Sequence, residues 1–168
     1  MTILCEWGSK GIAVFPEDKK KSNALITLLD HPEEKSQDGV LSWPGEYDIQ
    51  DIAIRGIGHK EGGQVSYSLE MENVRFGFLS APLQEWGDYE LELLGDVDVL
   101  VIPTNKPGIV QKLVDEIDPR ILIPVQNGDA DTFAEVLNYC GAKGQQPETE
   151  YKIKTLPVEG RTVVVLKS

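Results

Sequence analysis

The stretch Leu41-Ser42-Trp43-Pro44-Gly45-Glu46-Tyr47-Asp48-Ile49 decides how this chain is organised. It predicts a strand, a turn at Pro44-Gly45 and a second strand. Proline fixes one backbone angle and glycine supplies a positive one, as a type II turn requires. After the turn, Tyr47 and Ile49 alternate with charged residues, and the alternation changes phase at Gln50-Asp51. A change of phase predicts a bulge or a bend at that point.

Before this stretch, short apolar segments predict strands at residues 2–5 and 11–15. Residues 24–29 form one apolar run, which predicts a strand buried on both faces. The polar segment 30–39 follows that strand and holds His31, one of only two histidines. We expect this segment to be a solvent-facing, mobile loop, and we expect His59 to be an exposed loop residue.

After this stretch, residues 64–71 and 74–78 alternate between apolar and polar residues, which predicts a hairpin. Apolar runs at 97–102 and 121–125 predict two buried strands. We expect their ends, at 103–105 and 124–129, to lie at one edge of a sheet, where pockets form in α/β folds. Residues 151–156 and 162–166 predict a closing hairpin.

Helical spacing of apolar residues predicts three helices, at 83–93, at 109–117 and at 132–140. Gly95 is expected to end the first. Thr104 or Asn105 is expected to cap the second, with Pro107 in its first turn. Thr132 and Glu135 predict a capping box for the third.

Length and composition predict one globular domain over residues 1–168, because 40% of the residues are apolar and 26% are charged. The sequence shows neither a membrane-length apolar run nor the features of a signal peptide, so we expect a cytoplasmic protein. The formal net charge of −12 argues against binding nucleic acid or an anionic membrane. Cys5 and Cys140 lack the spacing of a zinc site. The sequence identifies no partner protein and leaves self-association open.

Three segments resemble motifs of the metallo-β-lactamase fold: Ser42-Trp43-Pro44-Gly45-Glu46-Tyr47, the segment from Leu94 to Pro103, and the segment from Asp118 to Pro124. The resemblance is to a small bacterial and archaeal branch similar to ascorbate-6-phosphate lactonase, and it spans roughly residues 11 to 166. It implies an α/β fold, a shortened four-layer αββα sandwich of two mixed β-sheets. It also implies a metal site at one edge of the sandwich.

In that family, two zinc or similar ions are held by a His-x-His-x-Asp-His loop, a later histidine, a bridging aspartate and a final histidine. These ions activate a water and polarise the substrate. The resemblance places most ligand positions on other residue types here. In the first motif only His31 matches, and Ala81 and Gln126 stand where the bridging aspartate and the last histidine would be. The former metal-site positions are therefore Leu29, His31, Glu33, Glu34, Ala81 and Gln126.

This donor set predicts that zinc is not bound and that no cofactor is required, because most imidazole and carboxylate ligands are missing. Asp30, His31, Glu33 and Glu34 could still hold a hard cation weakly through oxygens. Alternatively, His31 is simply hydrogen-bonded to a neighbouring acid.

Three functions follow from these residues. The favoured hypothesis is a metal-free relative that acts by binding or assembly. The alternatives are a metal-dependent hydrolase with a reduced or single-metal site that uses His31 and Glu33, and metal-independent chemistry in the old cleft. In each case we expect Leu29, Ser80, Ala81 and Gln126 to converge at the edge of the sandwich.

Overall fold

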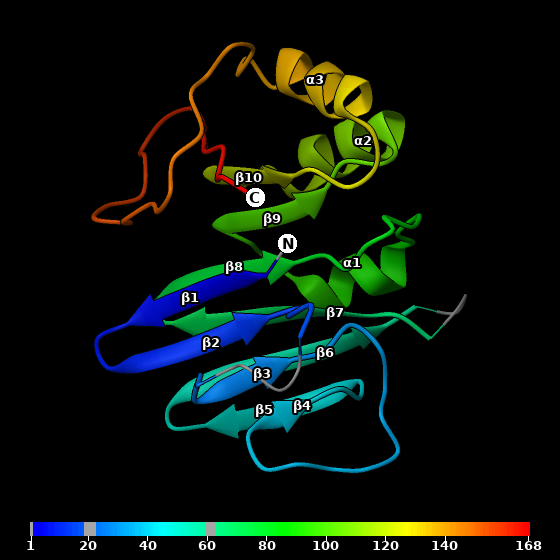
Figure 1. The fold of residues 1–168 in the computed structure, drawn as a ribbon, viewed down its shortest axis with the longest axis vertical. Coiled ribbons are helices and arrows are strands. Elements are labelled where there is room, and N and C mark those ends of the chain that lie inside the picture. Colours follow the sequence, from blue (N-terminus) through cyan, green and yellow to red (C-terminus); the bar gives the residue numbers. More distant parts are fainter. Residues whose placement is uncertain (1, 19–22, 60–62) are drawn as a thin grey trace.

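The computed structural model describes residues 2–18, 23–59 and 63–168, and its strands form two mixed sheets (Figure 1). The smaller sheet has the order β1-β2-β3-β4 and contains β1 (Ile3–Trp7), β2 (Lys10–Val14), β3 (Ile26–Leu28) and β4 (Val40–Leu41). The larger sheet has the order β11-β10-β9-β8-β7-β6-β5. It contains β5 (Gly45–Ile49), β6 (Ile52–Gly58), β7 (Val65–Met71), β8 (Val74–Phe78), β9 (Val99–Pro103), β10 (Ile121–Val125) and β11 (Thr162–Val163).

Two apolar cores hold these layers together. One lies between the sheets and includes Ile12 and Leu28 from the smaller sheet with Tyr67 and Val101 from the larger. The other lies between the larger sheet and the helices α1 (Asp88–Leu94), α2 (Pro107–Ile117) and α3 (Ala130–Tyr139). The predicted fold of two mixed sheets with outer helices is confirmed, and the helices of the described residues all pack on the seven-stranded sheet. None of these helices is long and apolar enough to cross a membrane.

The stretch that was expected to form a strand, a turn and a strand carries the chain from one sheet to the other. Leu41 ends β4 in the smaller sheet, and Gly45, with φ 149°, begins β5 in the larger sheet. Local bonds fix the crossing. The Ser42 Oγ accepts from the Glu33 N–H at 3.0 Å, and the Tyr47 hydroxyl donates to the Trp43 carbonyl at 2.8 Å. The turn therefore joins two layers rather than two neighbouring strands.

Tyr67 links the sheets directly. It lies in β7 and is fully buried. Its hydroxyl lies 2.6 Å from the Leu29 carbonyl oxygen and 3.0 Å from the Leu41 carbonyl oxygen, at the ends of β3 and β4. Burial, with smaller contributions from Tyr47 and Asp30, raises the pKa of this hydroxyl well above its ordinary value. Tyr67 therefore keeps its proton and remains a donor across the sandwich.

The bulge or bend expected at Gln50-Asp51 is instead a tight turn between two paired strands. Ile49 pairs directly with Ile52, and the two residues between them both have positive φ, 49° and 67°. This is the geometry of a two-residue hairpin turn that matches the strand twist. The change of phase in the sequence comes from the turn itself. The hairpin of residues 65–78 is confirmed and has the same turn geometry at Glu72-Asn73.

The first helix is shorter than predicted. It begins at Asp88, after Gly87, and the segment 81–87 has no regular structure. Leu83 and Trp86 are nevertheless buried in the core beside the helices, while Tyr89 is exposed. The apolar residues of the irregular segment 81–87 and of α1 therefore pack on the same core. Their spacing in the sequence resembled that of one long helix, which is why the helix was predicted to begin too early.

The expected caps of the second and third helices lie elsewhere. The Thr104 hydroxyl donates to the Val125 carbonyl, and the Asn105 Oδ1 accepts from the Leu83 N–H, so neither side chain caps α2. The residue before α2 is Lys106. The cap of α3 is Asp129, whose carboxylate accepts from the Thr132 N–H at 2.7 Å.

The closing hairpin is also wrong. Within the described residues, 151–156 form no strand, and β11 pairs in parallel with β10. β11 therefore forms the edge of the larger sheet through one parallel partner and has no hairpin partner among the described residues. Ile153 and Leu156 instead pack against the core between the sheets.

We expect Gly56→Ala to destabilise the fold by about 1–3 kcal/mol, because a Cβ there has no space. It would lie 2.8 Å from the Trp43 carbonyl oxygen and 3.2 Å from the Pro44 Cα, both backbone atoms of the crossing segment. Chemical denaturation measures the change. Gly108→Ala is the matched control, since no atom lies within 4 Å of its Cβ position. Equal stability of the two variants would contradict the prediction.

Candidate functional site at the shared edge of the sheets

Several strand ends meet at one edge of the sandwich. Strands β8, β9 and β10 run in parallel, so their carboxyl ends lie side by side. The smaller sheet reaches the same edge, because the Val65 N–H at the start of β7 donates to the Asp30 carbonyl at 2.8 Å. The bond from Thr104 Oγ1 to the Val125 carbonyl confirms that the ends of β9 and β10 are adjacent, as predicted. This edge is where the sequence places the candidate site.

The former metal-site positions at this edge differ in their surroundings. Leu29 is 4% exposed, and its N–H donates to the Leu41 carbonyl. Ala81 and Gln126 are exposed to solvent. Hydrogen bonds connect Leu29 to the crossing segment and Ser80 to β7. The convergence of Leu29, Ser80, Ala81 and Gln126 at this edge stays a prediction.

Hydrogen bonds hold part of the polar segment that follows β3. The His31 Nδ1 lies 3.0 Å from the Asp30 Oδ1, which matches the interpretation of an imidazole bonded to a neighbouring acid. Both backbone groups of Glu33 are bonded, its N–H to the Ser42 Oγ and its carbonyl to the Trp43 Nε1. Glu34 is exposed, and so are residues 35–39. This segment is solvent-facing as predicted.

The donor set at these positions does not fit a dinuclear metal centre. A leucine side chain and an alanine methyl group have no donor atom, and the amide of Gln126 is a weak, neutral donor. In residues 2–18, 23–59 and 63–168, no group of three or more histidine, cysteine, aspartate or glutamate side chains is placed to hold a metal ion. The Asp30 and His31 side chains are paired at this edge, with Asp30 Oδ1 3.0 Å from His31 Nδ1.

Beside the end of β8, the structure holds a buried polar cluster that we call the serine network: His59, Gln64, Ser66, Ser80 and Gln84. The His59 Nε2 lies 3.0 Å from the Ser66 Oγ, and the Ser66 Oγ lies 3.1 Å from the Ser80 Oγ. The Ser66 Oγ also accepts from the Ser80 N–H at 2.9 Å. His59 is only 9% exposed, so its expected exposure is wrong.

The glutamines extend the serine network toward the irregular segment 81–87. The Gln64 Nε2 donates to the Ser80 Oγ and to the Pro82 carbonyl, both at 3.2 Å, and the Gln84 Nε2 donates to the Gln64 Oε1. In the described part of the chain, no buried side-chain nitrogen or oxygen lacks a hydrogen-bond partner. The network is therefore a set of mutually hydrogen-bonded groups beside the position of Ala81.

An aromatic contact fixes the histidine of the serine network. The His59 ring meets the Trp86 ring edge to face, with centroids 4.8 Å apart. Burial lowers the pKa of His59 below its ordinary value of 6.5, and the Glu90 carboxylate opposes this only in part. The imidazole therefore prefers its neutral form, which suits its contacts with a hydroxyl and an indole.

Sequence reasoning missed the serine network for a physical reason. Ser66 belongs to the polar face of an alternating strand, and that face was expected to be exposed. In the structure, the segment 81–87 covers the beginning of that face, so Ser66 is 0% exposed while Ser68 is half-buried. No local pattern in the sequence predicts that the segment 81–87 covers Ser66.

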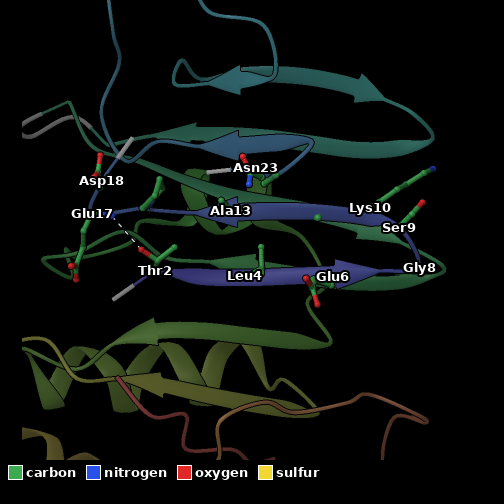
Figure 2. Close-up of a pocket in the computed structure, with 13 residues that line it drawn as sticks. Thr2, Leu4, Glu6, Gly8, Ser9, Lys10, Ala13, Glu17, Asp18 and Asn23 are labelled. Atoms are coloured by element: carbon green, nitrogen blue, oxygen red, sulfur yellow. Dashed lines mark hydrogen bonds between the residues drawn. The ribbon is translucent and has the colours of Figure 1, made fainter. Parts of the chain in front are cut away.

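A separate hollow lies on another part of the described surface. It is a groove of about 540 Å³ on the outer face of the smaller sheet, lined by residues that include Leu4, Glu6, Lys10 and Ala13. Figure 2 shows these side chains on β1 and β2. The groove holds no cluster of catalytic or metal-binding side chains among the described residues.

Comparisons with solved structures agree with this fold. A protein from Thermotoga maritima, assigned as a Zn-dependent hydrolase of the metallo-β-lactamase superfamily, superposes with a TM-score of 0.79 at 20% identity, covering 98% of this chain and 93% of that one. The metallo-β-lactamase fold protein YhfI from Bacillus subtilis superposes with a TM-score of 0.65 at 9% identity, covering 99% and 89%. At such identities the likeness establishes the fold alone.

The family follows from the sequence itself. The family model of the β-lactamase superfamily domain matches residues 20–126, and the chain belongs to this superfamily. A search of curated proteins finds no match.

We expect Ser66→Ala to lower the free energy of unfolding by about 1–3 kcal/mol, because it leaves buried partners in the serine network without their hydrogen bonds. Ser68→Ala, on the same face of the same strand but half-buried, should change stability by less than about 0.5 kcal/mol. Urea denaturation compares the two variants. A Ser66→Ala protein as stable as the unaltered one would show that the network contributes nothing.

Acidification should destabilise the protein through His59. Its pKa is lower in the folded state than in the unfolded chain, so the unfolded chain binds more protons between the two pKa values and stability falls as pH drops below about 6.5. Denaturation curves at several pH values should show a smaller loss in His59→Asn than in the unaltered protein. His31→Asn, at an exposed histidine, is the control and should keep the full loss. Identical pH profiles for the unaltered protein and His59→Asn would contradict this assignment.

Proposed function

We propose that this chain is a metal-free member of the β-lactamase superfamily that acts by binding or assembly rather than by metal-dependent hydrolysis. The observation that carries the proposal is the set of hydrogen bonds that the two histidines make. One ring nitrogen of His59 bonds within the serine network, and one ring nitrogen of His31 bonds to Asp30. Neither imidazole belongs to a group of three donors in the described residues.

The chemistry of the neighbouring positions supports the same proposal. A dinuclear site is anionic before its ions bind, since it assembles several carboxylates and imidazoles. Three of the corresponding positions here, Leu29, Ala81 and Gln126, carry isobutyl, methyl and amide groups, which are neutral and need no cation. Buried polar groups become stable when they bond to each other, and the serine network does this without an ion.

The alternative of a reduced, single-metal hydrolase depends on His31 and Glu33. Asp30, His31 and Glu33 are the candidate donors, but one ring nitrogen of His31 is already directed at Asp30, and the three do not form a metal-holding group among the described residues. A catalytic zinc site generally uses three protein ligands and one open position for water. We therefore rank this alternative second.

Metal-independent chemistry would need an accessible nucleophile. The 3.0 Å contact between His59 Nε2 and Ser66 Oγ resembles a base beside a hydroxyl. However, Ser66 is 0% exposed and its Oγ also bonds to two groups of Ser80. A substrate cannot approach this hydroxyl unless the segment 81–87 moves, so we assign the contact a structural role.

The proposal leaves the bound partner open and requires no cofactor. The net charge of −12 favours a protein partner over nucleic acid or an anionic membrane. The two cysteines are free thiols, which is consistent with a reducing compartment such as the cytoplasm. Self-association is one form of assembly that this proposal includes.

Protein purified without chelators should contain far less than one zinc ion per chain by elemental analysis, and adding a chelator should leave its melting temperature unchanged. A metal bound only to the native state would stabilise it by mass action, and its removal would lower the melting temperature. Stoichiometric zinc that binds with micromolar affinity, or a chelator-induced drop of several degrees, would overturn the proposal.

A restored variant provides the positive control for that measurement. The combination Leu29→His, Glu34→His, Ala81→Asp and Gln126→His returns the ligand types that the resemblance implies. If its circular dichroism shows an intact fold, it should bind zinc more tightly than the unaltered protein in a calorimetric titration. Equal, tight binding by both proteins would show that the natural residues already form a metal site.

A further inference from the structure

Strand β1 is an edge strand of the smaller sheet. In the part of the chain that the structure describes, Ile3–Trp7 pairs only with β2, so one row of its backbone N–H and C=O groups faces away from the sheet. Leu4 is 57% exposed and Trp7 is 41% exposed. An edge strand of this length with exposed apolar side chains is a template for adding another strand.

The charge around β1 suits association between two copies of an acidic protein. The whole chain carries a net charge of −12, which opposes contact between copies at most of the surface. Residues 2–16, which form the β1–β2 hairpin, contain one acid, Glu6, and one base, Lys10. This hairpin is therefore a neutral region where two copies can meet with little repulsion.

The other free strands are less suited to self-pairing. Strand β5 is the edge of the larger sheet, and antiparallel pairing centred on Tyr47 would set Glu46 opposite Asp48 of a second copy. Like charges directly opposite each other destabilise a strand pair. Strands β4 and β11 each contain only two residues.

We propose that two copies of this chain pair antiparallel through β1, with Cys5 opposite the partner's Cys5. This register pairs all five residues of the strand. It sets Ile3 opposite the partner's Trp7 and Leu4 opposite the partner's Glu6, so no like charges face each other. A register centred on Glu6 would set two carboxylates opposite each other.

The pairing has a structural consequence for the groove on the smaller sheet. Leu4 and Glu6 of β1 both line this groove (Figure 2). Joining two β1 strands would produce one continuous eight-stranded sheet and bring the two grooves side by side on its outer face. The inference deepens the assembly named in the proposed function, but it does not require the metal-free part of that proposal, because a metal-bound hydrolase could pair through the same strand.

Sedimentation equilibrium tests the pairing directly. The unaltered protein should show about twice the chain mass of 18.6 kDa at micromolar concentrations. Leu4→Glu places a carboxylate opposite the partner's Glu6 in both halves of the interface. This repulsion should weaken the dimer by about tenfold or more. Leu4→Lys removes the same leucine but faces the partner's Glu6 with an opposite charge, so it should keep the dimer.

Val158→Glu adds the same charge at a highly exposed residue outside the hairpin and should not change the dimer. A monomer at all concentrations would overturn the proposal, and so would a dimer that Leu4→Glu leaves intact. If Leu4→Lys disrupts the dimer as strongly as Leu4→Glu, the assigned register is wrong. The metal content of the same samples tests the proposed function separately.

Oxidative cross-linking tests the register a second time. Residues opposite each other in antiparallel strands have Cα atoms about 4.5–5.5 Å apart, which permits a disulfide. Burial, together with Glu6, raises the pKa of the Cys5 thiol to about 11, so the reaction needs an added copper oxidant. A disulfide-linked dimer should form in Cys140→Ser and be lost in Cys5→Ser. Cross-linking through Cys140, or no cross-linking of the dimer, would overturn the Cys5 pairing.

Discussion

The fold depends on the buried hydroxyl of Tyr67. A phenol inside an apolar core is costly unless its hydroxyl is hydrogen-bonded. Here it contacts the Leu29 and Leu41 carbonyl oxygens, which lie at the ends of the neighbouring strands β3 and β4 of the smaller sheet. One side chain of the larger sheet therefore satisfies backbone groups of the other sheet and fixes their relative position. The crossing segment from Leu41 to Gly45 follows from this constraint, because β4 must end beside Tyr67 and β5 must begin against Gly56.

The same constraint explains why the sheet edge can keep its shape with different residues on it. Apolar packing and Tyr67 hold the strand ends together, so the edge exists whatever residues occupy it. Such an edge can be stabilised in two ways: by anionic ligands around cations, or by neutral groups bonded to one another. The serine network represents the second solution. The same space cannot hold both arrangements, because a carboxylate buried there without a cation would be destabilising. Membership of the superfamily therefore predicts this architecture better than it predicts the chemistry.

The sequence predicted those features that depend on local periodicity. The alternation from Val65 to Phe78 gave the hairpin, and the apolar runs before Thr104 and Gln126 gave two buried parallel strands. It failed where a contact between distant segments decides the structure. His59 looked exposed because its partners Ser66 and Trp86 come later in the chain, and the segment that covers them has no regular structure. Helix caps failed for a similar reason, since Thr104 and Asn105 bond to neighbouring strand ends and loops rather than to the helix they precede. The former metal positions could be located by the resemblance, but their surroundings could not.

Charge and strand edges together determine which surfaces of this protein can form contacts. An acidic surface keeps copies apart, and Glu46 and Asp48 protect the long edge of the larger sheet in the way that charged residues commonly protect edge strands. The β1–β2 hairpin lacks that protection, and it exposes Leu4 and Trp7 instead. The exposed apolar side chains of this edge are the surface residues that solubility explains least. Polar groups of the serine network bond to one another, whereas Leu4 and Trp7 face outward, so among the described residues β1 is the strand best suited to contact with another strand.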